Sequence, residues 1–156
     1  MLMFLDGEWN GYRGTLISLA LVTVDDQEWY ETLECFCPTP WVEQHVMANL
    51  RRAPVTYEEM QASLARFLGR FEGVDIIADW PEDIQRFCET LVTGPGQRLD
   101  YNGKMTFEIV RGLPDTAETS KVPHNALEDA KALRLSWMEA HDDDDIWEIE
   151  HGNRRS

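Results

Sequence analysis

Basic residues are scarce in this sequence. Its 156 residues include 14 Lys and Arg against 29 Asp and Glu, which gives a formal net charge of −15 at pH 7. A protein that holds DNA or RNA on a broad basic face carries the opposite balance of charge. The shortage of basic residues therefore argues against extended nucleic-acid binding and against binding to an anionic membrane surface.

Cysteines and long apolar segments are scarce as well. The three cysteines, Cys35, Cys37 and Cys88, form an odd and sparse set that suits reduced thiols better than a disulfide framework. The longest apolar run, residues 15–24, is too short to span a bilayer. The first residues reach Asp6 without a basic leader, so no signal peptide is visible. We therefore expect a cytoplasmic protein without a membrane partner.

The amount and spacing of apolar residues predict an α/β fold. Apolar residues make up 43% of the chain and charged residues 28%, which is usual for a globular protein of about one domain. Alternating and continuous apolar runs predict strands, and apolar residues three and four apart predict helices. The predicted strands are 2–5, 16–24, 28–33, 74–78 and 105–110, and the predicted helices are 40–50, 56–73, 81–92 and 125–140.

The order of these segments predicts how the sheet is built. The first three strands follow one another through short turns, which is typical of an antiparallel meander. Further strands then alternate with helices, which predicts a mixed sheet flanked by helices. Strands 2–5 and 74–78 should lie inside the sheet, and ligands usually bind at the carboxyl ends of such strands. We expect residues 1–140 to form the single domain and residues 141–156, with acidic run 142–145, to be a solvated tail.

The first candidate site is the triplet Asp6-Gly7-Glu8. Two carboxylates two residues apart on an extended chain point to the same side, where their hard oxygen atoms suit a divalent cation. The pattern alone is common by chance, and Asp26-Gln27-Glu28 is a second copy that we interpret as a solvated turn. The apolar strand that leads into Asp6 distinguishes the first triplet from the second.

The second candidate is the motif His-x-Ala-x-x-Asp, which runs from His124 to Asp129. Chance predicts only about 0.02 occurrences in a chain of this composition. His124 precedes a predicted helix, and Asp129 lies within its first two turns. A histidine with a near-neutral pKa can take a proton from water, and the aspartate can hold a metal beside it. Helix capping by local side chains is the alternative interpretation.

Together, these motifs resemble those of the DEDDh 3′–5′ exonucleases, which have a ribonuclease H-like fold. The resemblance covers residues 1–140 and is nearest to the short bacterial and phage exoribonucleases of the ribonuclease AS-like group. Asp6 and Glu8 match the first family motif, and His124 and Asp129 match the third. The middle motif departs from the family pattern. Asp83, which starts an apolar helix, is the favoured residue there, and Asp79, at the preceding strand end, is the alternative.

The resemblance implies a two-metal hydrolysis of phosphodiesters. Asp6, Glu8, Asp83 and Asp129 would hold two Mg²⁺ or Mn²⁺ ions, and His124 would act as the general base. The enzyme would release nucleoside 5′-monophosphates from single-stranded 3′ ends, on RNA in preference to DNA. Relatives are often homodimers, which extends to this chain only by analogy.

Two tryptophans are candidates for substrate binding. Trp9 follows the first motif and Trp80 follows strand 74–78, so either indole could stack on a terminal base. Packing at a sheet edge is the alternative. The acidic balance also leaves two rival functions open: a non-catalytic module that docks a basic partner, and a metal phosphoesterase acting on small nucleotides.

Overall fold

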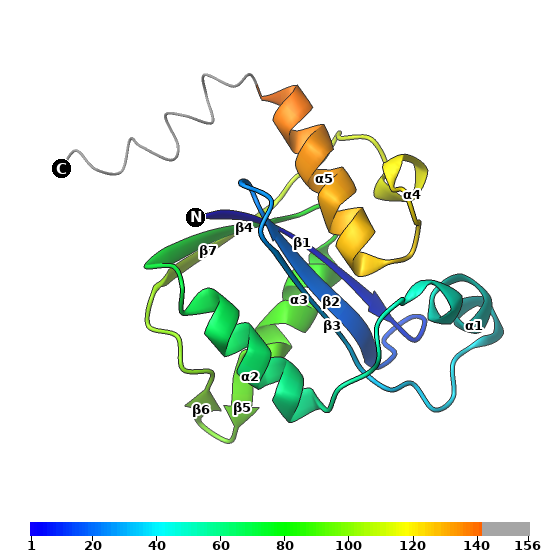
Figure 1. Ribbon diagram of the computed structural model, residues 1–156, viewed down its shortest axis with the longest axis horizontal. Helices are drawn as coiled ribbons and strands as arrows, with labels where there is room; N and C mark the ends of the chain where they lie inside the picture. The colour runs from blue at the N-terminus through cyan, green and yellow to red at the C-terminus, as the bar shows by residue number, and fades with distance from the viewer. Residues whose placement is uncertain (142–156) are drawn as a thin grey trace.

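A five-stranded mixed sheet organises the chain in the computed structural model, which describes residues 1–141 (Figure 1). The strands lie in the order β3-β2-β1-β4-β7. Strands β1, β2 and β3 form the predicted antiparallel meander, and β4 and β7 run parallel to β1. The strand bounds are β1 Leu2–Trp9, β2 Leu16–Thr23, β3 Glu28–Thr32, β4 Gly73–Ala78 and β7 Lys104–Ile109. The predicted inside positions of β1 and β4 are confirmed.

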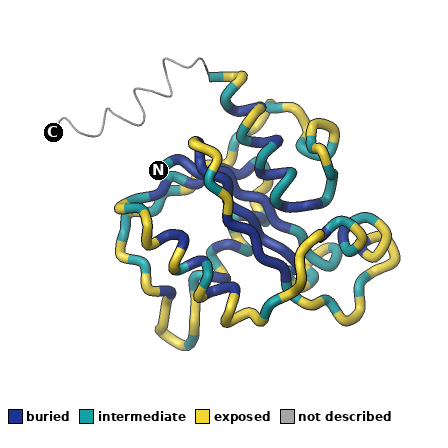
Figure 2. The backbone as a smooth tube through the Cα atoms, in the orientation of Figure 1, coloured by how far each residue is buried: buried dark blue, intermediate teal, exposed yellow. Residues whose placement is uncertain are grey.

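Helices cover both faces of this sheet. On one face lie α2, Tyr57–Leu68, and α3, Pro81–Thr90, and on the other lies α5, Ala126–Ala140 (Figure 1). Side chains alternate along β1, as the twofold strand repeat requires: Met3 and Leu5 pack with the α2 and α3 core, whereas Leu2 and Phe4 pack against α5. Figure 2 shows the buried strands between the more exposed layers. The sequence prediction of a mixed α/β sheet flanked by helices is confirmed.

Strand β1 is longer than its apolar run predicts. It continues through Asp6 and Glu8 to Trp9, and it stays paired with β2 until the register shifts between Glu8 and Trp9. The two acids therefore project from the carboxyl half of a strand, and not from the chain beyond it. The apolar run 2–5 did not predict this extension, because backbone pairing with β2 holds the polar residues in the strand.

Two helix predictions are wrong in their bounds. The capping box at Thr56 and Glu59 is present, but α2 ends at Leu68 with Gly69 as its cap, and Gly73 already begins β4. The predicted helix 40–50 divides into α1, Pro40–His45, and the 3₁₀ turn η1, Met47–Asn49. The Asn49 amide donates to the carbonyl of His45, so a side chain satisfies a carbonyl at the α1 end.

Some short elements were not predicted from apolar spacing. Helix α4, Thr116–Thr119, lies between the predicted strand 105–110 and the predicted helix 125–140, and Asp115 caps it. Strands β5, Val92–Gly94, and β6, Gln97–Arg98, form a small hairpin around Pro95 and Gly96. No helix within residues 1–141 is long and apolar enough to cross a membrane. The acidic run 142–145 lies outside the described residues.

Candidate metal centre

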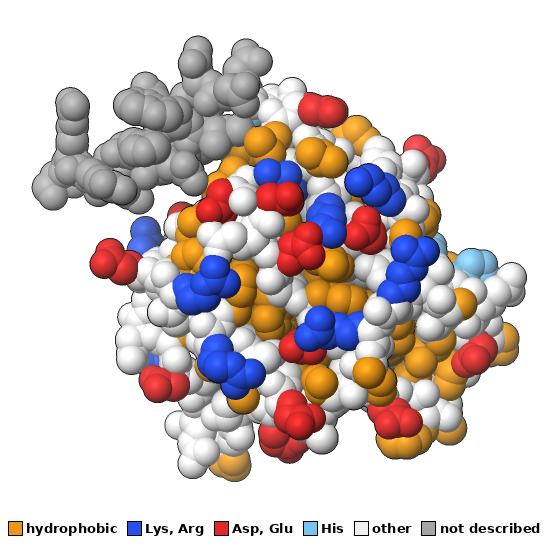
Figure 3. Space-filling view, in the orientation of Figure 1, with side chains coloured by type: hydrophobic (Ala, Val, Ile, Leu, Met, Phe, Trp, Pro, Cys, Tyr) orange, Lys and Arg blue, Asp and Glu red, His pale blue; other side chains and the backbone are white. Residues whose placement is uncertain are grey.

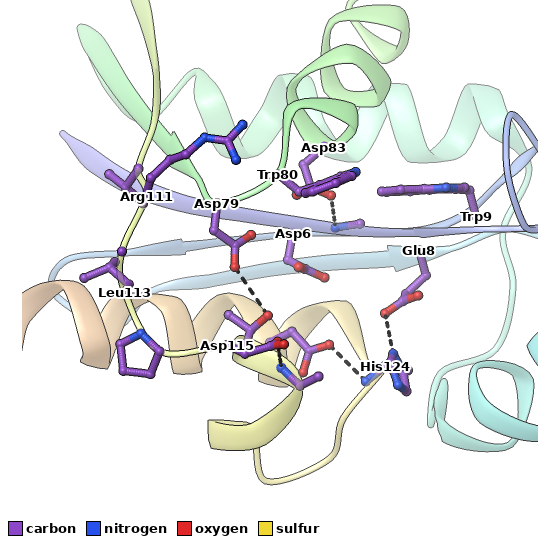
Figure 4. Close-up of a pocket in the computed structure, with 17 residues that line it drawn as sticks. Asp6, Glu8, Trp9, Asp79, Trp80, Asp83, Arg111, Leu113, Asp115 and His124 are labelled. Carbon is purple, nitrogen blue, oxygen red and sulfur yellow. Dashed lines mark hydrogen bonds and ion pairs between the residues drawn. The ribbon is translucent and has the colours of Figure 1, made fainter.

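All of the predicted site residues line one cavity of about 520 Å³. It lies where the carboxyl ends of β1 and β4 meet the start of α3 and the segment before α5 (Figure 4). The residues come from positions as distant as Asp6 and Asp129, so the fold brings both sequence motifs to one place. The predicted members are Asp6, Glu8, Trp9, Trp80, Asp83, His124 and Asp129, with the alternative Asp79 beside them.

Asp6, Asp79 and Asp83 form the first group of ligand atoms in this cavity. One carboxylate oxygen from each lies within 4.8 Å of the others. Asp6 projects from β1, Asp79 follows β4, and Asp83 lies in the first turn of α3. The structure therefore brings Asp79 and Asp83 into the same group, although the sequence presented them as alternatives for one position.

The backbone of Gly7 bonds the start of α3 to this group, since its N–H donates to Oδ1 of Asp83 over 3.1 Å. A Cβ at position 7 would be in ordinary contact with that oxygen, at 3.6 Å, but only 3.0 Å from Cδ1 of Leu19 on β2, so a larger residue would require the Leu19 side chain to move. The glycine between the two acids of the first motif is therefore part of the site.

Glu8, His124 and Asp129 form the second group, again with ligand atoms within 4.8 Å of one another. The Nδ1 atom of His124 lies 4.0 Å from Oε1 of Glu8. The backbone N–H of His124 donates to Oδ2 of Asp129 over 2.9 Å. His124 has a φ of 63°, in the left-handed region that few side chains adopt without support, and the Asp129 bond provides part of that support.

The acids of both groups are short of compensating partners. Oδ2 of Asp6 and Oδ1 of Asp129 are buried without a hydrogen-bond partner among the described residues. Burial, and then the charges of neighbouring acids, raise the pKa of Asp6 well above its ordinary value, and burial also raises the pKa of Asp83. Burial and the charge of Asp129 raise the pKa of Glu8 to about 8.

Divalent cations would compensate the negative charge of these buried acids. Buried carboxylates are costly unless a counter-charge compensates them, and a bound cation is often the largest local charge in such a site. Two adjacent groups of hard oxygen atoms, with two oxygens left unpartnered, fit Mg²⁺ or Mn²⁺ by ligand type. Asp6, Asp79 and Asp83 would hold one ion, and Glu8 and Asp129 would hold the other.

His124 has the protonation behaviour that a base needs. Burial, and then the nearby charge of His45, lower the pKa of His124 below its ordinary value, which favours the neutral imidazole. The ring of Trp41 meets the His124 ring edge-on at 4.9 Å and stacks on His45 at 4.5 Å. Helix α1 therefore packs against His124, a contact that no local spacing in the sequence indicates.

Asn49 and Asn125 connect η1 to the segment that carries His124. The Asn125 amide donates to the carbonyl of Asn49 over 2.7 Å, and the Asn49 amide donates to the carbonyl of Pro123 over 3.1 Å. Oδ1 of Asn125 caps α5 by accepting from the backbone of Glu128. The helix cap considered for this motif therefore exists, but Asn125 makes it, and the His124 side chain remains directed to the cavity (Figure 4).

The two tryptophans lie along one rim of the cavity, where Figure 4 shows both rings edge-on. Trp80 is 55% exposed. Trp9 is partly buried, and the guanidinium of Arg86 lies 6.0 Å from its ring centre. Both indoles are placed where a base could contact them.

The segment after β7 also lines the cavity, and its polar residues there, Arg111, Asp115 and Thr116, were not singled out from the sequence. The Thr116 hydroxyl donates to Oδ2 of Asp79 over 3.4 Å. A signal for Arg111 was available, because it follows a strand predicted to end at residue 110 and parallel strands end at a common edge. No comparable signal along the chain indicates the short helix that carries Thr116.

No protein-family model matches this chain, and no curated protein matches it. The chemical interpretation of the cavity therefore depends on its own residues and their geometry.

Proposed function

We propose that this protein is a metal-dependent 3′–5′ exonuclease of the DEDDh type that acts on single-stranded nucleic acid, with RNA as its preferred substrate. The supporting observation is the pairing of two carboxylate groups in one cavity, with His124, whose pKa burial lowers, in one of them. The mixed sheet, with an antiparallel meander continued by parallel strands, is in keeping with the ribonuclease H-like fold that the resemblance implies.

The residues have distinct roles in this reaction. When bound, two Mg²⁺ or Mn²⁺ ions would polarise the phosphate and stabilise the attacking and leaving oxygens. His124 accepts a proton from water at its imidazole as the water oxygen bonds to phosphorus. The bond from phosphorus to the 3′ oxygen of the preceding nucleotide breaks, that oxygen takes up a proton, and a nucleoside 5′-monophosphate is released. Trp9 and Trp80 stack against the bases at the 3′ end.

An exonuclease assay on end-labelled strands tests this proposal. Matched RNA and DNA oligomers, labelled at either end, are incubated with Mg²⁺ or Mn²⁺. We expect 3′ label to leave at once as a mononucleotide, 5′ label to give a ladder of shortened strands, and RNA to be cleaved faster. Absence of stepwise shortening from the 3′ end at saturating metal would contradict the proposal.

A matched pair of variants assigns the activity to the cavity. Asp6→Asn should abolish the ladder, whereas Asp26→Asn should leave it unchanged. Asp26 belongs to the second Asp-x-Glu triplet, but its side chain is 64% exposed and faces Arg134. Equal loss of activity in both variants would show that the cavity acids have no special part.

The net charge of −15 favours the rival proposal of a non-catalytic module that binds a basic partner. Calorimetric titration with Mn²⁺ in the presence of a nucleoside monophosphate distinguishes the two. The nuclease proposal expects saturable binding that Asp6→Asn removes, whereas the rival expects no saturable binding at this cavity.

A further inference from the structure

Arg111 is the one Lys or Arg among the residues that line the cavity, and six acidic residues line it as well. Within residues 1–141, no carboxylate oxygen lies within ion-pair distance of its guanidinium. The neighbouring cation Arg86 differs, because Glu82 and Glu89 both pair with it. Arg111 is thus a positive charge beside an acidic cavity, and it has no acidic ion-pair partner within the described residues.

The backbone fixes where this charge begins. Arg111 follows β7, which runs parallel to β4, and the N–H of Val110 donates to the carbonyl of Ala78 over 2.9 Å. The start of the Arg111 loop is therefore attached to the strand end that also leads to Asp79. Figure 4 shows the guanidinium extending toward the Trp80 side of the cavity and away from His124.

The charges of the cavity explain why a substrate needs this residue. When bound metal has displaced the protons of the cavity acids, six carboxylates carry more negative charge than two divalent ions neutralise. A single phosphodiester can contact the ions directly, but a second phosphate of the same strand would meet a surplus of negative charge. A guanidinium can offset that charge and bind two phosphate oxygens at once through its planar fork.

We propose that Arg111 binds the phosphate on the 5′ side of the scissile one, so that the cavity selects strands with at least two phosphates over esters with one. The inference depends on the proposed exonuclease function and specifies its substrate class. The terminal nucleotide then lies on the His124 side of the cavity, and the preceding nucleotide lies beside Trp80 with its 5′ phosphate on Arg111.

Two dinucleotides that differ by one phosphate test this inference. One carries a 5′ phosphate and the other a 5′ hydroxyl, so that both contain the same scissile bond. We expect the wild-type protein to cleave the phosphorylated dinucleotide with kcat/KM higher by about tenfold or more, as a charge-assisted hydrogen bond would give. Arg111→Ala should remove this preference while retaining cleavage of the unphosphorylated dinucleotide, and Arg111→Lys should keep part of it.

Arg66→Ala is the matched control, because Arg66 is exposed on α2 and does not line the cavity. This variant should keep the full preference. The inference is overturned if the wild-type protein cleaves both dinucleotides equally, if Arg111→Ala retains the preference, if it slows both substrates alike, or if Arg66→Ala also loses the preference. Failure of the wild-type protein to cleave any strand would instead contradict the proposed function itself.

Discussion

At single residues of the cavity, the side chain that binds a cation lowers the stability of the metal-free protein. Asp6 is buried with one oxygen unpartnered, and burial and neighbouring acids raise its pKa. An acid in this setting destabilises the metal-free protein but binds a cation well. We predict that Asp6→Asn raises the melting temperature in EDTA and removes the additional stabilisation that Mn²⁺ gives the wild-type protein.

The same substitution should lower exonuclease activity by more than about 100-fold. Loss of a residue that only hydrogen-bonds to a metal ligand already lowers metal affinity or activity by about 10- to 100-fold. Thermal denaturation with and without Mn²⁺, together with the exonuclease assay, checks both effects. Asp26→Asn serves as the control. A variant that melts lower in EDTA, or that keeps its response to Mn²⁺, would contradict the role given to Asp6.

Glu8 predicts how the stability of the metal-free protein depends on pH. Its pKa is raised from 4.5 to about 8 by burial and the charge of Asp129, and burial raises that of Asp129 from 3.8 to about 6. In this range the folded state binds more protons than the unfolded state, so the free energy of unfolding falls as pH rises. We expect stability in EDTA to decrease from about pH 5 to pH 8.

Denaturant titrations across this range measure the slope, and Glu8→Gln should make it shallower because glutamine does not titrate. Saturating Mn²⁺ should reduce or reverse the slope, since the metal competes with protons for the same oxygens. A metal-free protein whose stability increases with pH through this window would contradict the assignment.

The sequence could reveal site residues only where their partners are close along the chain. The pairs Asp6 with Glu8 and His124 with Asp129 have local spacing, and both pairs line the cavity. The shared placement of Asp79 and Asp83 depends on how α3 leaves β4, which periodicity does not encode. The contact between Trp41 and His124 joins residues from distant segments and left no local signal.

At the scale of elements, prediction succeeded where apolar repeats were long. Strand β2 and helix α2 both bury a continuous face, so the hydrophobic pattern alone reveals that they exist, although it placed the end of α2 too late. Strands β5 and β6 are short and mostly exposed, and α4 has no buried residue. Such elements form from local hydrogen bonds and caps, which apolar spacing cannot detect.

The α1–η1 segment yields a prediction about the position of His124. The Asn49 side-chain amide donates to the carbonyl of Pro123, the residue before His124. The backbone carbonyl of Asn49 accepts from the side-chain amide of Asn125. Loss of the Asn49 side chain should let His124 leave its left-handed conformation. We expect Asn49→Ala to lower kcat by about 10- to 100-fold, a typical cost of small misplacement, with little change in KM.

A double-mutant cycle separates positioning from general damage. In a His124→Ala background there is no base to misplace, so Asn49→Ala should cause no further loss of residual activity. Asn102→Ala, at an exposed asparagine outside the cavity, is the matched control and should retain full kcat. An equal loss from Asn49→Ala in both backgrounds would show that Asn49 acts on folding and not through His124.

At the scale of the whole molecule, the acidic balance restricts how a nucleic acid can bind. On the face in Figure 3, basic side chains are interspersed with acidic ones and form no continuous patch. Several of the basic residues are already paired, as Lys131 is with Glu28 and Glu128. Binding of a strand should therefore depend on the cavity, with Arg111 and bound metal as its positive charges, and gain little from the outer surface.

This restriction predicts that affinity hardly depends on strand length. For RNA of one 3′ sequence, KM should change by less than about twofold between 6 and 20 nucleotides, because no basic groove contacts the added phosphates. With one or two phosphate contacts at about 0.7 each for single strands, log KM should rise with log salt with a slope near 1. Steady-state kinetics on a length series at several salt concentrations measures both quantities. A KM that falls steadily with length, or a slope of about 4 or more, would require many phosphate contacts and thus a basic surface outside the cavity.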